Sequence, residues 1–340
     1  MEILHFLGLE NANIPAQLMN AIWLGSLYSL FALGYAIVFS VLGILNLSHS
    51  AIFMWGAYFG LAASCGTSVY DGKCVELNHA LWTAIPAAII GGGILAVVID
   101  RIAFYPLRKR NAPRLSQLIS SIGVAIILVN LAQLRFTAER KGFPIADVPN
   151  TPINVPNGLD IEQPLDVARL ALALVFQESG VSISPIQILV IIVAILLMVG
   201  LSYVVARTRL GKAMRTVAFN ARVGNLLGIN TELIYMIAFF ISGALAGSAG
   251  ILFALARNPA VDPFMGDSLA LKGLTVIVLG GLGSIRGAVV GGFLIALIEV
   301  YINTATKYGY LDQAFVFMLF FFILLVRPQG ILGQPIEDRA

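Results

Sequence analysis

Residues 207–231 read RTRLGKAMRTVAFNARVGNLLGINT, a short polar segment between two long apolar runs. The segment holds five cations and no acid: Arg207, Arg209, Lys212, Arg215 and Arg222. Short loops rich in Lys and Arg between apolar spans stay on the cytoplasmic side of a membrane. The segment therefore predicts a chain that crosses the bilayer repeatedly, with this loop inside the cell.

The same segment has the spacing of a short amphipathic helix. Small and apolar residues recur at intervals of three and four: Ala213, Met214, Val217, Ala218 and Ala221. Gly228 follows them, as expected of a residue that ends a helix. The pattern fits two interpretations: an apolar ridge that docks on a partner protein, or an ordinary cationic loop with some helicity.

The composition excludes an ordinary soluble domain. Of 340 residues, 59% are hydrophobic and only 11% are charged, and the mean hydropathy is +0.90. A soluble domain has about a quarter of its residues charged, so we expect an integral membrane protein. The net charge of +3 does not indicate a nucleic-acid partner, because the cations cluster in loops between apolar runs.

The apolar segments predict an all-α, polytopic membrane protein. We expect about nine transmembrane helices, in residues 18–45, 51–63, 80–104, 115–134, 185–206, 233–256, two within 269–300, and 311–326. The number is eight if the short segment 51–63 only re-enters, and ten if the first span is broken. The count of nine places the N-terminus outside and the C-terminus in the cytoplasm.

The loops divide by charge, and we expect one membrane domain over residues 1–340. A second cationic cluster consists of Arg101, Arg108, Lys109, Arg110 and Arg114, and it should share the cytoplasmic side with the loop 207–230. The segment 135–184 has five prolines between Pro144 and Pro164 and should form an external loop. Cys65 and Cys74 share another external loop, where either a disulfide or two free thiols would fit.

Several motifs resemble those of the LivH-type family, the permeases of branched-chain amino acid ABC transporters. They are AMRTVAFN at 213–220, LLGINT at 226–231, NLSH at 46–49, LGGLGSIRGAVVGG at 279–292 and RPQGILG at 327–333. The resemblance spans residues 24–333. It departs at Phe219, where members often have an acid, and at Arg286, where they often have proline.

The resemblance implies a permease subunit, with coupling to a separate ATPase through a cytoplasmic helix. The implied coupling residues are Ala213, Met214, Arg215, Ala218, Asn220, Leu227 and Gly228. The implied partners are a second related permease, two ATPase subunits that bind ATP and Mg, and a soluble solute-binding protein. The implied solute is a branched-chain or other neutral amino acid, and the implied location is the bacterial inner membrane.

Signals of an enzyme are missing from the sequence. There is no Gly-x-Ser-x-Gly, no His-Glu-x-x-His and no Walker phosphate loop, and the three histidines are scattered. We therefore expect no catalytic residue, no metal and no cofactor bound by this chain. A urea or other small-solute permease of the same family and an ion-coupled secondary transporter remain alternatives, although Glu299 is nearly the only acid deep in a span.

Polar side chains are costly in a membrane unless they face a cavity or one another, and small residues let membrane helices pack closely. These two rules each single out a set of residues. The candidates for a solute pathway are Asn46, Ser48, His49, Asn130, Gln133 and Glu299, each of which could instead form an interhelical hydrogen bond. The candidates for helix packing are Gly243, Gly247, Gly283, Gly287 and Gly291.

Overall fold

The computed structural model describes residues 14–65, 80–142, 184–257, 260–306, 311–327 and 329–333, and its fold is all-α as predicted. The longer helices are α2 (Ile14–Leu42), α3 (His49–Cys65), α4 (Ala80–Ile99), α6 (Arg114–Phe136), α8 (Pro185–Arg207), α11 (Thr231–Arg257), α12 (Met265–Gly280), α13 (Ile285–Thr306) and α14 (Leu311–Val326). The short elements are the π-helix η2 (Asp100–Phe104), α5 (Tyr105–Lys109), α9 (Arg209–Phe219), α10 (Ala221–Leu226), β1 (Lys141–Gly142) and β2 (Ala260–Val261).

Each of the nine apolar segments predicted to span the membrane contains a helix. Six described helices are long and apolar enough to cross a bilayer, and they correspond to α2, α4, α6, α8, α11 and α13. By contrast, α3 has 17 residues and α12 and α14 have 16 each, which is short of the roughly 20 residues that a perpendicular crossing needs. The nine crossings therefore stay a prediction.

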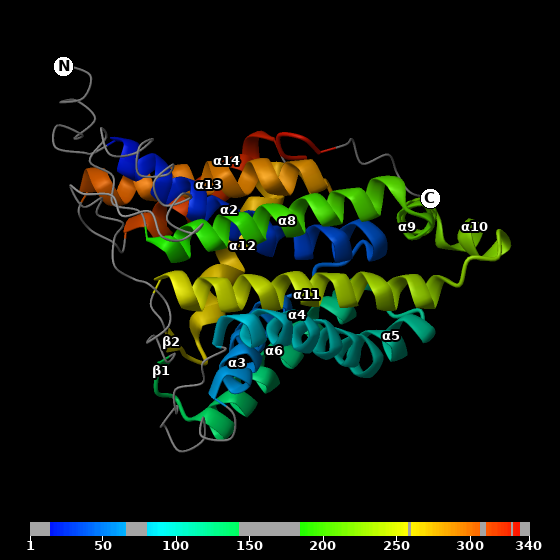
Figure 1. Ribbon diagram of the computed structural model, residues 1–340. Helices are drawn as coiled ribbons and strands as arrows, with labels where there is room; N and C mark the ends of the chain where they lie inside the picture. The colour runs from blue at the N-terminus through cyan, green and yellow to red at the C-terminus, as the bar shows by residue number, and fades with distance from the viewer. Residues whose placement is uncertain are drawn as a thin grey trace, which may run out of the picture.

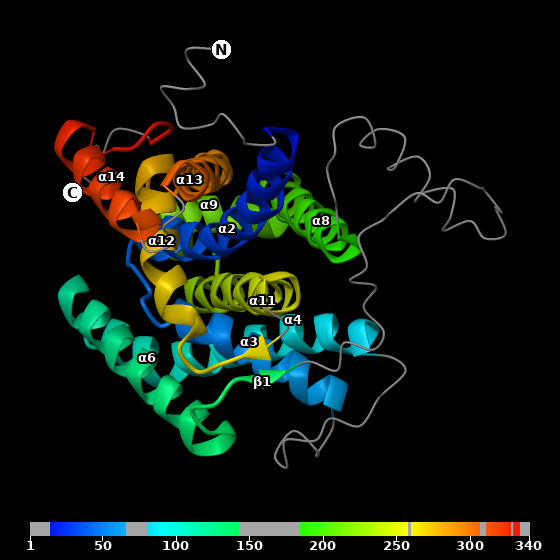
Figure 2. The same ribbon diagram turned by 90° about the vertical axis from the view of Figure 1, so that its left-hand side faces the viewer.

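Helix α2 lies at the centre of the bundle. Figure 2 shows it surrounded by α8, α11, α12 and α13, and it packs against all four. The side chains between Leu27 and Val38 on α2 are almost all buried, which is why this helix is apolar on every side. The short helices α5, α9 and α10 lie at one end of the bundle, and β1 and β2 lie at the other (Figure 1).

Small residues let α3, α4 and α11 approach one another closely. Gly247 of α11 lies against Gly56 of α3 and Ala88 of α4, and a Cβ added to Gly247 would overlap the Ala88 carbonyl. One turn away, a Cβ added to Gly92 would lie 2.5 Å from the carbonyl oxygen of Gly243. Membrane helices associate through such backbone contacts, so these glycines hold α3, α4 and α11 together.

The turn between α12 and α13 also depends on glycine. Gly281 has φ 107° and Gly283 has φ 81°, and side chains disfavour both conformations. Gly283 was predicted to pack between helices; it lies instead in this turn, where an added Cβ would be in ordinary contact with Ser40 at 3.5 Å. Gly287 and Gly291 of α13 do lie against the backbone of α12.

The segment that follows α14 closes this end of α12. The amides of Ile331 and Leu332 donate to the carbonyl oxygens of Leu279 and Gly280 at 2.7 and 3.0 Å. These carbonyls lie in the last turn of α12, where a carbonyl group has no hydrogen-bond donor within the helix itself. The RPQGILG motif at 327–333 thus supplies hydrogen-bond donors to the last carbonyl groups of α12.

At the opposite end, β1 pairs with β2 in antiparallel register, with Lys141 opposite Val261. A 3.7 Å ion pair between Arg140 and Asp262 supports the pairing. Of the predicted external loop 135–184, residues 143–183 lie outside the described residues, and so does Cys74. Cys65 ends α3 and is buried, and its pairing with Cys74 stays a prediction.

Candidate functional site

The segment 207–231 forms two helices where the sequence suggested one. Thr208 begins α9 by accepting a hydrogen bond from the Gly211 amide at 3.2 Å. Asn220 then has extended backbone angles and ends α9. Its side-chain oxygen accepts from the amides of Arg222 and Val223 at 2.9 and 3.2 Å, which begins α10. Asn220 is therefore the corner between the two helices.

Gly228 ends α10 as predicted. Its φ is 79°, and its amide donates to Asn225 O at 3.0 Å, while the Ile229 amide donates to Gly224 O at 3.0 Å. These two bonds with a left-handed glycine between them form a Schellman motif. The chain then turns directly into α11, whose first turn is capped by Asn230.

The predicted apolar ridge of α9 faces the chain's own bundle. Met214 and Val217 are each only 3% exposed, and α9 packs on α8, α2 and α11. Ala213 and Ala218 are half-buried, and the exposed Arg215 donates to Val205 O. These residues hold α9 in place, so Met214 is not part of a free docking ridge as the sequence had suggested.

A different apolar set is exposed on the two helices. Phe219 is 82%, Leu226 87% and Leu227 69% exposed. The helices α9 and α10 lie at one end of the molecule, and α10 lies beyond the end of α11 (Figure 1). Large apolar side chains left exposed on a polar segment mark a contact with another protein or with the membrane surface.

An ion-pair cluster joins the start of α11, just after this segment, to η2 and α5. Arg108 donates to both carboxylate oxygens of Asp100, at 2.6 and 3.3 Å, and to Glu232 at 3.0 Å. Its guanidinium also lies 4.8 Å from the ring centre of Tyr235. Asp100 lies on η2, Arg108 on α5 and Glu232 in the first turn of α11. The cluster therefore fixes the start of α11 against η2 and α5.

His49 is locked between three helices. Its ring lies against Phe31 and Tyr35, with centroids 4.8 and 4.4 Å away. Nε2 lies 3.1 Å from Phe31 O and Nδ1 lies 3.2 Å from Ser242 Oγ. Because a carbonyl only accepts, Nε2 carries the proton and Nδ1 accepts from the serine. His49 thus connects α3 to α2 and α11 through hydrogen bonds.

The other predicted pathway residues do not form one group with His49. Asn46 and Ser48 are buried, and Asn46 Oδ1 accepts from the Ser48 amide and hydroxyl at 3.2 and 2.5 Å in the turn just before α3. Asn130 is exposed on α6 and donates to Ile126 O of its own helix. Gln133 is half-buried on the same helix. Asn46 Nδ2 remains buried without a partner.

Glu299 belongs to a buried cluster that the sequence analysis missed. Its Oε1 lies 2.8 Å from Lys272 Nζ, and Tyr28 donates to its Oε2 at 2.5 Å. Lys272 also donates to the Tyr28 hydroxyl at 3.4 Å. The side chains of Lys272 and Glu299 are 7% and 2% exposed. The triangle ties α12, α13 and α2 together; its signal in the sequence is a lysine inside the apolar run 269–300.

Comparison with known proteins gives consistent matches over the whole chain. The family model "Branched-chain amino acid transport system / permease component" matches residues 17–324. The chain is 34% identical over 342 residues to the high-affinity branched-chain amino acid transport system permease protein BraD of Pseudomonas aeruginosa, covering 100% of this chain and 99% of that one. It is 30% identical over 331 residues to LivH of Escherichia coli, covering 95% and 97%.

A weaker match concerns a different solute. The autoinducer 2 import system permease protein LsrC of Yersinia pseudotuberculosis is 31% identical over 142 residues, which is 40% of this chain and 38% of that one. No solved structure matches the chain significantly.

The buried triangle predicts strong coupling between Lys272 and Glu299. Lys272→Met or Glu299→Gln alone should lower the free energy of unfolding by about 3–5 kcal/mol, because each leaves the other group buried without its partner. The double variant should lose much less than the sum of the two. The measurement is denaturant unfolding of the four proteins in mixed micelles. Additive losses would show that the two residues do not stabilise each other.

Proposed function

Because the chain belongs to the family of permease components of branched-chain amino acid transport systems, we propose that it is the membrane-spanning subunit of a binding-protein-dependent ABC importer. The observation that carries this proposal is the full-length match to BraD and LivH permeases, together with a two-helix segment that exposes apolar side chains at one end of the bundle. The chain moves the solute, and a separate ATPase supplies the energy.

The buried polar groups favour this mechanism over ion-coupled transport. A secondary transporter uses midplane carboxylates that bind and release ions. In this chain Glu299 has both oxygens occupied, one by Lys272 and one by Tyr28. Such a carboxylate stabilises the bundle and is poorly suited to carry a proton across it.

The proposed ATPase contact centres on Phe219, Leu226 and Leu227. These exposed side chains would enter an apolar groove of the ATPase, while Met214 and Val217 keep α9 fixed to the bundle. Phe219 stands where members of the family often have an acid. The proposed contact is therefore apolar at this position, whereas the acid of those members carries a charge. Motion at the start of α11 would reach η2 and α5 through Glu232, Arg108 and Asp100.

The proposed partners are the two ATPase subunits, which hold ATP and Mg, a second related permease and a soluble binding protein. The proposed solute is a branched-chain or other neutral amino acid, because the relatives that match over their whole length carry this function in their names. Import of another small solute is the alternative, and the partial match to an autoinducer 2 import permease supports it.

The proposed orientation puts α5, α9 and α10 in the cytoplasm. Five cations lie between Arg207 and Arg222, and five more lie between Arg101 and Arg114. Both groups fall at the end of the bundle opposite β1 and β2 (Figure 1). Basic residues in short loops set the orientation of a membrane protein, so the bundle is inserted with β1 and β2 outside.

Leu226→Asp should detach the ATPase from the permease. An unpaired carboxylate in an apolar contact costs about 3 kcal/mol or more, which is roughly a hundredfold in binding. The measurement is co-purification of the ATPase and solute-stimulated ATP hydrolysis in liposomes. Phe264→Asp is the matched control, because Phe264 is 49% exposed and lies between β2 and α12, outside the spans and at the other end. Retention of the ATPase and of coupled hydrolysis by Leu226→Asp would contradict the docking proposal.

The orientation predicts which single cysteines an impermeant maleimide reaches in intact cells. In a background with Cys65 and Cys74 changed to Ser, Glu139→Cys should be labelled directly, because Glu139 is exposed next to β1. Arg222→Cys should be labelled only after the membrane is opened. Labelling of Arg222→Cys in intact cells would show that the bundle is inserted the other way.

A further inference from the structure

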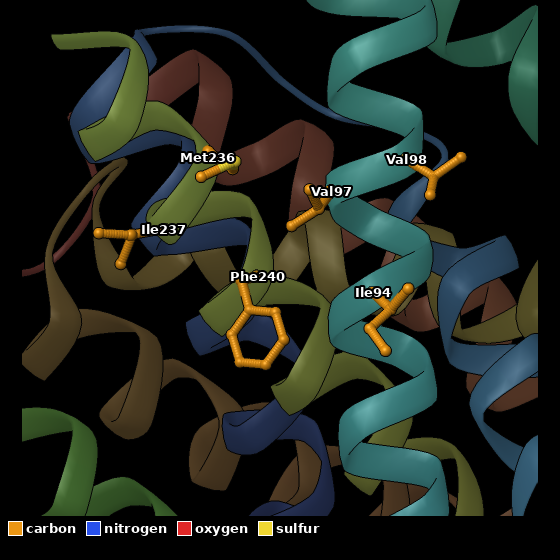
Figure 3. A pocket seen from close by; sticks show the side chains of 6 residues that line it. All are labelled: Ile94, Val97, Val98, Met236, Ile237 and Phe240. Atoms are coloured by element: carbon orange, nitrogen blue, oxygen red, sulfur yellow. The ribbon is translucent and has the colours of Figure 1, made fainter. Parts of the chain in front are cut away.

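A groove opens between α4 and α11 on the outside of the bundle. It encloses about 340 Å³, and its lining consists of Ile94, Val97, Val98, Met236, Ile237 and Phe240. All six are apolar, and Figure 3 shows three of them on each helix. Ile94 is 54% and Val98 44% exposed, so the groove faces the surroundings of the bundle. At the depth of these two spanning helices those surroundings are lipid or another membrane protein.

A cation stands at one end of the groove. Arg101 lies on η2, one turn after Val97 and Val98 of α4, and its Nη2 donates to the sulfur of Met236 at 3.3 Å. Met236 lines the same end of the groove as Val98 (Figure 3). The guanidinium of Arg101 also lies 5.1 Å from the ring centre of Tyr105. A thioether is a weak acceptor, so most of the five guanidinium donors remain available.

The two acids near Arg101 are engaged elsewhere. Asp100 is fully buried and bonds to Arg108 through both oxygens, and Glu232 bonds to Arg108 at 3.0 Å. Among the described residues Arg101 has no carboxylate partner within ion-pair distance. The end of the groove therefore presents a half-buried positive charge next to an apolar channel.

We propose that this groove binds an anionic phospholipid, with its phosphate on Arg101 and an acyl chain between α4 and α11. The orientation proposed above places Arg101 at the cytoplasmic leaflet, where anionic lipids attract basic side chains. Charge complementarity decides between lipid and protein: an apolar helix of a second permease would fill the groove but leave Arg101 unpaired. A phosphate oxygen accepts the guanidinium donors that Met236 leaves free.

The proposed site predicts that the full chain retains an anionic lipid in preference to a zwitterionic one. The purified permease is mixed in detergent with equal amounts of phosphatidylglycerol and phosphatidylcholine of the same chain length, and retained lipids are counted by native mass spectrometry. Wild type should retain phosphatidylglycerol about fivefold over phosphatidylcholine, which corresponds to about 1 kcal/mol for one basic residue at an anionic surface. Arg101→Gln should lower this ratio to about one.

Two further variants separate the parts of the site. Arg286→Gln removes an exposed cation at the turn between α12 and α13, and it should keep the preference for phosphatidylglycerol. Ile94→Trp should fill the groove and reduce retention of both lipids. Because Ile94 is exposed, this variant should keep the thermal midpoint of the wild type, which shows that the bundle is intact.

Two results would overturn the lipid site. One is an unchanged lipid ratio in Arg101→Gln. The other is a cross-link from Val98→Cys to a second permease chain in the assembled transporter, since that would make the groove a protein interface. Neither result bears on coupling to the ATPase, which the Leu226→Asp variant tests separately.

Discussion

The close contact of α3, α4 and α11 around Gly247 is the constraint on which the rest of the bundle depends. Lipid tails are as apolar as leucine, so helices in a bilayer gain little from burying apolar side chains. They gain from backbone approach, and Gly56, Gly92, Gly243 and Gly247 allow it. With these three helices fixed, α11 presents Ser242 to His49, and α2 is positioned between α11 and α13.

Polar groups then specify which helices meet. His49 joins α2, α3 and α11, while Lys272, Glu299 and Tyr28 join α12, α13 and α2. Both clusters include a hydrogen bond to α2, from His49 to Phe31 O in one and from Tyr28 to Glu299 in the other. A buried ion pair adds little to the free energy of unfolding compared with apolar side chains, but breaking it is costly. We infer that these clusters fix the arrangement of the helices, and that motion for transport occurs around them.

The positions of the helices could be predicted from the sequence, because apolar length and cationic loops depend on local composition. The left-handed end of α10 was also predictable from Gly228. The contacts between helices were not, because they depend on which faces meet. Lys272 was overlooked inside an apolar run, Gly283 was assigned to packing although it forms a turn, and the ridge of α9 was expected to be free although Met214 is buried. These errors concern tertiary contacts and a local turn, namely the partner of Lys272, the backbone angle of Gly283 and the direction of Met214, which spacing alone leaves open.

The central claim is that this chain passes an amino acid only when a partner ATPase drives it. The direct measurement is uptake of labelled leucine by liposomes that contain the permease with its second permease and ATPase, with the binding protein added on the external side. Uptake should require ATP on the side of α9 and α10 and should be unaffected by collapsing a proton gradient. Uptake that occurs without ATP and follows the proton gradient would contradict this claim.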